Sequence, residues 1–391
     1  MSAPLLLDLT HTSHTRARTG IQRVARSLHS ALGACAVAIT HDSHRHAWRT
    51  LQRWEVANLA ATDASAKRGA HWPLTAKLGG RTARLLGRAA PALPENSGLV
   101  VPEVFSPGVA AALPALFAAT RGPRVAVFHD AIALQFPELT PPKTVARFPG
   151  YLRELLAFDA IAANSETSRY ALLDYWRWLG VRNTPPVVAI PLGVDFKSNP
   201  LGYFPGGIAM PVVLCVGSLE ARKNHVALLD ACEQLWARGA RFELRLVGLA
   251  NRETGAAALA RVRALQAAGR PLRYDGPLGE AAVSVAYAAC TFTVYPSLVE
   301  GFGLPVIESL AHGKPCICSA RGALGESARG GGCVALDLVD TPGLAAAIGR
   351  LLAAPGEVAA LATAARARAF RTWIDYAGEL SAWLRTLSRR N

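Results

Sequence analysis

The sequence lacks any apolar run long enough to cross a lipid bilayer. Its longest apolar segments, Pro211–Gly217 and Thr291–Tyr295, have the length of a strand, whereas a spanning helix needs about 20 apolar residues. We therefore predict no transmembrane helix. The apolar run near the N-terminus has no basic segment ahead of it and leads straight into Asp8, which is wrong for a secretory signal. We expect a cytoplasmic protein.

Acidic residues are also scarce. The 28 Asp and Glu residues are outnumbered by 42 Lys and Arg, which gives a formal net charge of +14 and points to an anionic partner. Basic residues are dispersed, and no helix-turn-helix, zinc-finger or aromatic RNA-binding pattern occurs, so no nucleic acid is expected. An anionic membrane surface, at the inner face of the cytoplasmic membrane, is the preferred partner. A basic nucleic-acid-binding protein stays the alternative from a different functional class.

Cysteines are few and odd in number. The seven thiols lie mostly within apolar runs, as small core residues do in a reducing compartment. Cys316 and Cys318 alternate along one predicted strand and so share a face, but no second Cys or His pair at ligand spacing accompanies them. We therefore expect no metal site.

The chain is long and apolar enough for two domains. It has 391 residues, 51% of them hydrophobic and only 18% charged, which argues against long disorder. In the first half, short apolar strands alternate with segments of helical periodicity, beginning with a strand at Leu5–Leu9 and a helix from Ile21. This alternation predicts a parallel sheet wrapped by helices. The further strands expected are Leu99–Val101, Arg124–Phe128, Ala160–Ala163 and Val187–Ile190, and the helices are Arg147–Leu156 and Thr167–Leu179.

A second alternating series begins at Pro211, after a Gly- and Pro-rich segment, 196–210, that we interpret as a linker. The sequence thus predicts two doubly wound α/β domains, at 1–195 and 211–372. Such domains bind ligands at the carboxyl ends of their strands, so we expect the site in a cleft between them. The strands expected in the second series are Val212–Val216, Arg241–Val247, Leu272–Tyr274, Phe292–Tyr295 and Cys316–Ser319, and the helices are 224–237, 254–268, 280–288, 305–312 and 342–353.

Between Asp42 and Pro94 the pattern is weaker and strongly basic. Four cations recur there at helical spacing, with leucines on another face. A basic amphipathic helix of this kind would contact anionic lipid. A solvated helix face is the alternative, and the Gly79-Gly80 pair disfavours a helix. The cations are Lys77, Arg81, Arg84 and Arg88.

The strongest functional signal is a glycine-rich loop between a predicted strand and a predicted helix. The run from Pro296 to Glu308 holds Glu300 in the loop and Glu308 within the helix. Glycines at 301 and 303 let backbone amides approach a ligand closely, and the helix N-terminus favours anions. Such a loop can hold a polar sugar and its diphosphate.

This Glu-x7-Glu run resembles the signature of the family-four retaining glycosyltransferases, whose fold is the GT-B arrangement of two Rossmann-like domains facing each other across a cleft. The resemblance implies that Glu300 faces the donor sugar as a catalytic residue and that Glu308 holds the ribose. It also implies that 1–195 binds the acceptor, that 211–372 binds the nucleotide sugar, and that a final helix in 373–391 packs back on the first domain. The residues implied to bind the donor sugar are Gly301, Phe302, Gly303 and Leu304.

A second match follows the first strand of the second series, where the sequence reads Gly-Ser-Leu-Glu-Ala-Arg-Lys. Two adjacent cations there, Arg222 and Lys223, would neutralise a departing diphosphate, as a metal does in other transferases. Many relatives place the arginine directly after the glycine, where this chain has Ser218; the Arg-Lys pair resembles the mannosyltransferase-like branch instead. Because no Asp-x-Asp triplet occurs, we expect a metal-independent reaction with no cofactor besides the nucleotide sugar.

The first half carries two further matches. Gly20, at the start of the helix after the first strand, resembles the family's glycine loop that closes on the diphosphate. His129 and Asp130 follow the strand Arg124–Phe128 and resemble the family's His-Asp pair, whose histidine touches the donor sugar near the reacting carbon. We assign His129 and Asp130 to catalysis and Gly20 to binding of the donor phosphate, whereas Ser165 is explained as a helix cap.

The combined prediction is a retaining glycosyltransferase that moves a hexose, with mannose from GDP-mannose favoured, to a hydroxyl of a glycan or lipid-linked acceptor in surface-polysaccharide synthesis. No residue is an obvious covalent nucleophile beneath the sugar, which fits a front-face mechanism in which the leaving phosphate takes the proton. Loss of Glu300 or Lys223 is expected to cost far more turnover than stability. Other GDP-, UDP- or dTDP-sugars stay open as donors, and a sugar-nucleotide isomerase or a catalytically inactive sensor on the same fold stays an alternative.

Overall fold

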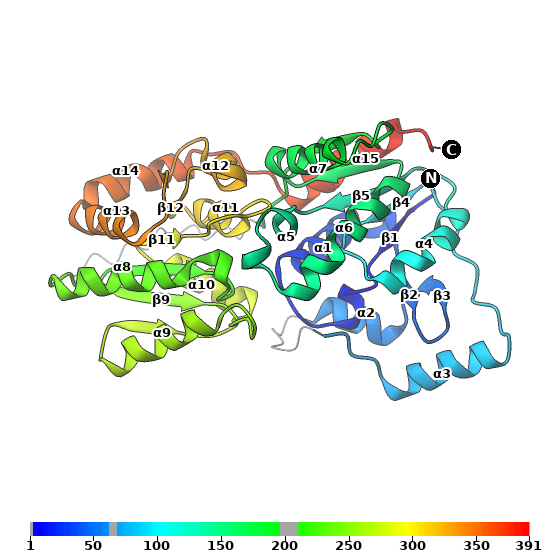
Figure 1. Cartoon of the computed structure of the whole chain (residues 1–391), viewed down its shortest axis with the longest axis horizontal. Helices are drawn as coiled ribbons and strands as arrows, with labels where there is room; N and C mark the ends of the chain where they lie inside the picture. The colour runs from blue at the N-terminus through cyan, green and yellow to red at the C-terminus, as the bar shows by residue number, and fades with distance from the viewer. Residues whose placement is uncertain (1–2, 62–68, 196–209, 391) are drawn as a thin grey trace. The chain divides into compact units, whose positions relative to one another are not determined.

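The computed structural model describes residues 3–61, 69–195 and 210–390, which divide into two compact units (Figure 1). Unit 1 comprises Met1–Asp130, Arg147–Gly193 and Trp373–Asn391, and unit 2 comprises Ala131–Ala146 and Val194–Thr372. The C-terminal segment thus groups with the first half of the chain. The linker expected at 196–210 lies outside the described residues, except for Met210.

Unit 1 is built on a seven-stranded sheet with the order β3-β2-β1-β4-β5-β6-β7. All neighbouring strands are parallel except β2 and β3, which pair antiparallel at the edge. The sequence analysis located neither strand of this pair; β3 lies within the weakly patterned region between Asp42 and Pro94, and β2 directly precedes it. The strands are β1 (Leu5–Asp8), β2 (Ala36–Asp42), β3 (Ala47–Thr50), β4 (Leu99–Val101), β5 (Arg124–Phe128), β6 (Ala160–Ala163) and β7 (Val187–Ala189).

The helices of unit 1 follow from local signals in part. A capping box formed by Thr19 and Gln22 starts α1 at Gly20. The helix α15 packs along α1 and buries a stripe at helical spacing that includes Tyr376, Leu380 and Leu384. The helices are α1 (Gly20–Leu32), α2 (Arg53–Ala60), α3 (Leu74–Leu85), α4 (Pro107–Ala119), α7 (Glu166–Trp178) and α15 (Trp373–Thr386), while α5 (Ile132–Gln135) and the start of α6 (Pro142–Glu154) fall in the segment that groups with unit 2.

Unit 2 is built on a six-stranded parallel sheet with the order β10-β9-β8-β11-β12-β13. The five strands expected from the sequence are confirmed, although β9 begins at Glu243 instead of Arg241. The order reverses between β8 and β11, which are neighbours in space although two strands separate them in the chain. The strands are β8 (Val212–Val216), β9 (Glu243–Val247), β10 (Leu272–Tyr274), β11 (Phe292–Tyr295), β12 (Cys316–Ser319) and β13 (Cys333–Leu336).

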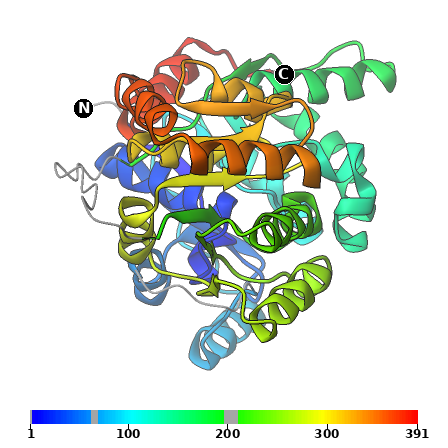
Figure 2. The same cartoon turned by 90° about the vertical axis from the view of Figure 1, so that its left-hand side faces the viewer.

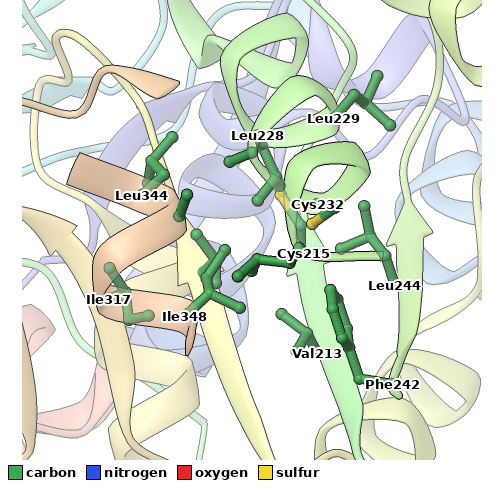
Figure 3. Packing of buried hydrophobic residues seen from close by; sticks show 14 of the residues in the cluster. Val213, Cys215, Leu228, Leu229, Cys232, Phe242, Leu244, Ile317, Leu344 and Ile348 are labelled. Carbon is green, nitrogen blue, oxygen red and sulfur yellow. The ribbon is translucent and has the colours of Figure 1, made fainter. Parts of the chain in front are cut away.

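Helices cover both faces of the second sheet (Figures 1 and 2). Alternate residues of each strand enter opposite layers: Val213 and Cys215 pack with α8, α9 and α13, whereas Leu214 packs with α10. Figure 3 shows the first of these layers, in which Leu228 and Leu344 meet the strand residues. The helices are α8 (His225–Ala237), α9 (Ala256–Ala267), α10 (Glu280–Ala289), α11 (Leu304–Ala311), α12 (Gly322–Ala328), α13 (Thr341–Ala353) and α14 (Pro355–Arg366).

None of the described helices alone has the length and apolarity needed to cross a bilayer. Among them, only α13 and α14, joined at a bend of 98°, together reach that length and apolarity.

Candidate active site

The two motifs of the second half meet at the point where the strand order of the unit 2 sheet reverses. One loop leaves the carboxyl end of β8 and the other leaves the adjacent β11, which is where doubly wound sheets bind ligands. The backbone amide of Leu298 donates to the carbonyl of Arg222 at 2.9 Å and ties the loops together. A 3-10 turn, Ala221–Lys223, ends at Asn224, whose left-handed backbone (φ 54°) and amide contact with the Val339 carbonyl at 2.6 Å fix its direction.

Glu300 lies between the two cations predicted to hold a diphosphate. Its Oε2 is 2.7 Å from Nη1 of Arg222, and its Oε1 is 2.5 Å from Nζ of Lys223. The Tyr295 hydroxyl donates to the same Oε1 at 2.9 Å and accepts from Lys223. Side-chain exposure is 9% for both Glu300 and Lys223 and 23% for Arg222. The sequence placed these residues around a common ligand, and the structure brings them into direct contact.

Burial and mutual attraction set the charges of this triad of Arg222, Lys223 and Glu300. Burial alone would raise the pKa of Glu300, but the two cations outweigh it and lower the pKa to about 2. Burial, followed by the neighbouring guanidinium, lowers the pKa of Lys223. Burial also opposes the charge of Arg222, yet Glu300 raises its pKa. Glu300 is therefore a carboxylate at neutral pH, which accepts hydrogen bonds and has no proton to donate.

A second acid completes the charge balance. Glu220 Oε2 lies 3.2 Å from Nε of Arg222, and Ser218 donates to the other oxygen of Glu220 at 2.7 Å. Two carboxylates thus face two cations, and the formal charge of the four side chains sums to zero. Sequence reasoning missed Glu220 and Tyr295, although Glu220 stands two residues before Arg222 and Tyr295 ends the strand before the glycine-rich loop.

The glycine-rich loop is held by α12. Gly303 adopts φ 100° at the start of α11, and a Cβ there would lie 2.9 Å from the Leu324 side chain, so packing and backbone both require glycine. The Ser327 hydroxyl donates to the carbonyl of Phe302 at 2.6 Å. Leu304, the first residue of α11, is buried. Packing and a hydrogen bond from α12 therefore hold the loop at the residues whose amides were predicted to bind a sugar.

Glu308 lies on α11 and is 6% exposed. The Tyr287 hydroxyl donates to its Oε2 at 3.2 Å, and the Tyr287 ring stacks on His312 at a centroid distance of 4.8 Å. Tyr287 thus orients the carboxylate of Glu308. The contact of Glu308 with the ribose stays a prediction.

His129 and Asp130 follow β5 in unit 1. Nε2 of His129 lies 2.7 Å from the Pro102 carbonyl, and Nδ1 lies 2.8 Å from the Asn164 amide nitrogen. Because the amide donates to Nδ1, the proton of the ring is assigned to Nε2. Burial lowers the pKa of His129, so the ring is neutral. Both nitrogens have protein partners, and the ring bridges the loops after β4 and β6; Asp130 is half-buried.

The neighbouring residues show local roles. Ser165 caps α7 by accepting from the Ser168 amide, as expected. At Gly20 a Cβ would meet no protein atom within 4 Å, so packing within the chain does not require glycine there. A glycine at this position would let a ligand approach the backbone closely.

Two buried carboxylates that the sequence did not reveal lie at the carboxyl ends of β1 and β4. Glu103 accepts from the amides of His11 and Thr12, both at 2.8 Å, and Asp8 accepts from the amide of Thr10 at 3.0 Å. Burial, and for Asp8 also the charge of Glu103, raises the pKa of each to about 7. These carboxylates hold the start of the loop that leads to Gly20.

No metal-ligand cluster is found among the described residues: no three His, Cys, Asp or Glu side chains are grouped suitably. Cys316 and Cys333 are partners on adjacent strands, and Cys318 follows on β12. Cys333 is the neighbouring thiol that sequence spacing did not suggest. The absence of a metal and of a cofactor stays a prediction.

The segment that holds this site is similar to a known family. The profile of the "Glycosyl transferases group 1" family matches residues 210–354. The Escherichia coli serotype-specific mannosyltransferase WbdA is 24% identical over 335 residues, which cover 80% of this chain and 38% of WbdA. The Escherichia coli O-antigen chain mannosyltransferase B is 27% identical over 226 residues, which cover 54% of this chain and 56% of that protein. The chain therefore spans only about two fifths to somewhat over half of these curated relatives.

Solved structures show the same fold. Sucrose-phosphate synthase from Thermosynechococcus elongatus superposes with a TM-score of 0.68 at 20% identity, and 98% of each chain is covered. The Anabaena protein HepE in complex with UDP-glucose superposes with a TM-score of 0.69 at 17% identity, over 98% of this chain and 100% of that chain. The predicted fold class, GT-B with two α/β domains, is confirmed, and residues 210–354, which hold the triad, are similar to the glycosyl transferases group 1 family.

Proposed function

We propose that this protein is a retaining glycosyltransferase that transfers a hexose from a nucleotide diphosphate sugar to a hydroxyl of a glycan or lipid-linked saccharide. The observation that carries the proposal is the triad of Arg222, Lys223 and Glu300, buried at the strand-order reversal of a domain that matches the family. Cations at this position suit a pyrophosphate, and a carboxylate suits sugar hydroxyls.

In the structure, the carboxylates of Glu220 and Glu300 form ion pairs with Arg222 and Lys223. We propose that the donor exchanges these partners: its diphosphate takes up Arg222 and Lys223, and Glu300 is released to accept from hydroxyls of the sugar. Such an exchange limits the cost of binding, because buried cations are never left without an anion. Preformed cations of this kind stabilise the charge that develops on a leaving diphosphate without waiting for reorganisation of solvent.

The protonation state of Glu300 restricts its role. With a pKa of about 2, it does not act as a general acid near neutral pH. We propose that it positions the sugar and stabilises positive charge at the anomeric carbon, while the leaving phosphate takes the proton of the acceptor hydroxyl. His129, if it reaches the sugar, contributes a neutral ring. The reaction is proposed to need neither metal nor cofactor, because the two cations supply the positive charge.

For the donor we propose GDP-mannose first. Two relatives are named mannosyltransferases, and one of them is named for the O-antigen chain, which also supports an acceptor in surface-polysaccharide synthesis at a membrane. HepE binds UDP-glucose, so UDP-sugars are the main competitors. Thermal shift with GDP-mannose, UDP-glucose and dTDP-glucose distinguishes them, because a donor that binds the folded state raises the melting temperature.

Transfer is then measured with the donor that stabilises the protein, using labelled sugar and a membrane extract as the acceptor source. The configuration of the product is determined by NMR. Lys223→Met should abolish the donor-induced shift and transfer. Lys314→Met is the matched control, because Lys314 is another lysine of unit 2 with a protein partner: it is half-buried and donates to the Cys290 carbonyl at 2.8 Å. A donor response that survives Lys223→Met, or an inverted product, would contradict the proposal.

A further inference from the structure

The helix α3 of unit 1 turns its leucines away from the protein. Leu74, Leu78 and Leu85 recur at positions i, i+4 and i+11, which lie on one side of a helix. They are 74%, 60% and 84% exposed, and Leu86, directly after the helix, is 65% exposed. Among the described residues these are four of fifteen large hydrophobic side chains recorded as exposed. Figure 1 shows α3 at the outer margin of unit 1.

The opposite side of α3 is made of small residues and holds it to the domain. Gly80 is buried, and a Cβ there would lie 2.9 Å from the Cβ of His44, so only glycine permits this approach. Ala76 and Ala83, on the same side, are half-buried. The glycine pair that disfavoured a helix in the sequence therefore has a packing role at one of its positions. An amphipathic helix normally buries its leucines, whereas this helix turns glycine and alanine toward the domain.

The exposed leucines are surrounded by positive charge. The sequence from Ala64 to Pro94 contains no Asp or Glu but contains six Lys and Arg residues. Arg84 lies against His46, with Nη1 to Nε2 at 2.8 Å. For Arg81 and Arg88, both exposed, no ion pair with a described carboxylate is recorded. The surface thus combines apolar side chains with uncompensated cations.

We propose that the leucine face of α3, with its flanking arginines, docks on a bilayer surface that carries anionic headgroups. Leucines enter the boundary between headgroups and acyl chains, and cations pair with lipid phosphates. A nucleic acid would use the cations but gain nothing from a row of leucines. A second copy of this chain would bring the same positive charges face to face. Charge complementarity therefore favours anionic lipid over both.

This inference goes beyond the proposed function, since it concerns a surface of unit 1 and no residue of the triad. Lipid binding by α3 and donor binding in unit 2 are measured separately, so one can fail while the other stands. If both hold, the enzyme works where a lipid-linked acceptor is found.

The test is flotation of the full-length protein with phosphatidylcholine vesicles that contain either no or about one third phosphatidylglycerol. We expect binding only to the anionic vesicles, weakened by salt because surface charges are screened. Arg81→Gln/Arg88→Gln should weaken binding by roughly tenfold or more, given a factor of about five per cation near such a surface. Leu78→Ser/Leu85→Ser should weaken it by a similar factor of roughly ten, because two apolar side chains no longer enter the boundary of the acyl chains. The controls are Leu338→Ser, which removes an exposed leucine of unit 2, and Arg238→Gln/Arg263→Gln, which removes two exposed arginines there.

Equal binding by the α3 variants and the controls overturns the proposal, as does equal binding to both vesicle types. Since the altered side chains are exposed, the melting temperature should not change, and loss of binding with an unchanged melting temperature supports docking. Tighter binding to a mixed RNA than to anionic vesicles assigns the face to nucleic acid. Self-association that Leu78→Ser/Leu85→Ser abolishes assigns it to a second copy. Either result refutes lipid docking.

Discussion

Replacing Glu300 with glutamine separates the structural role of this residue from its role in transfer. Glutamine keeps the shape of the side chain but removes the charge that Arg222 and Lys223 face. The sequence led us to expect a cost mainly in turnover. Because the structure buries the ion pairs, we now predict a substantial loss of stability as well.

The magnitude follows from the pKa of Glu300. The two cations bring it to about 2 from an ordinary value of 4.5, and each pKa unit corresponds to about 1.4 kcal/mol. The contribution of the carboxylate to folding is therefore about 3 kcal/mol, which agrees with roughly 3–5 kcal/mol for breaking a buried ion pair. Little discount for solvent is needed, since the side chain is 9% exposed.

The sign of the pH dependence is fixed by the direction of the shift. A lowered pKa stabilises the folded state fully above the unfolded pKa of about 4.5, and this stability is lost as the pH falls through about 2. The wild-type protein should exceed Glu300→Gln in stability by about 3 kcal/mol at pH 7. The difference should shrink below pH 4.5, where the unfolded wild-type chain takes up a proton.

The assay is urea unfolding at pH 7, 5 and 3.5, followed by hydrogen exchange of peptides from β8 and β11, because two domains need not unfold together. Glu357→Gln is the control: its partner Arg350 is 3.4 Å away and the glutamate is 37% exposed, so its loss should cost under about 1 kcal/mol. A Glu300→Gln protein as stable as the control at pH 7 would refute the reasoning. Pyrophosphate should restore stability to Glu300→Gln if the freed cations bind it.

Three other predictions address the loop, the buried carboxylates and the metal. Gly303→Ala should destabilise unit 2 by about 1–3 kcal/mol in urea unfolding, because its φ is 100° and a Cβ would lie 2.9 Å from Leu324; an unchanged midpoint contradicts this. The wild-type protein should lose stability as the pH rises from 4.5 through 7, since the pKa of Glu103 is raised to about 7; Glu103→Gln should flatten that slope between pH 5 and 8, and equal slopes would refute it. Transfer should continue in excess EDTA; activity that EDTA abolishes and Mg²⁺ restores would show that the cations do not replace a metal.

Local patterns determined much of the architecture. The alternation of short apolar strands and amphipathic helices predicted β8, β11 and β12 to the residue, because these strands are buried on both faces and consist mostly of apolar residues. The bounds of β10 were also predicted, although its Arg273 is exposed. The helix α4 was not predicted, because its apolar residues are distributed around the whole helix and Pro114 lies within it. The sequence also revealed the Gly-rich loop with its two glutamates and the Arg-Lys pair, because the residues that form each motif lie close together in the chain.

Tertiary structure decided what these motifs contact. Lys223 and Glu300, which are 77 positions apart in the chain, meet because β8 and β11 are neighbours in the sheet, and strand order cannot be read from periodicity. The same holds for Glu103, which reaches the amides of Thr12 from 91 residues away. The sequence showed that α3 has an apolar side and a basic side. Only the approach of Gly80 to His44 fixed the leucines outward, because the side that packs is chosen by the fit between surfaces, which no local pattern contains.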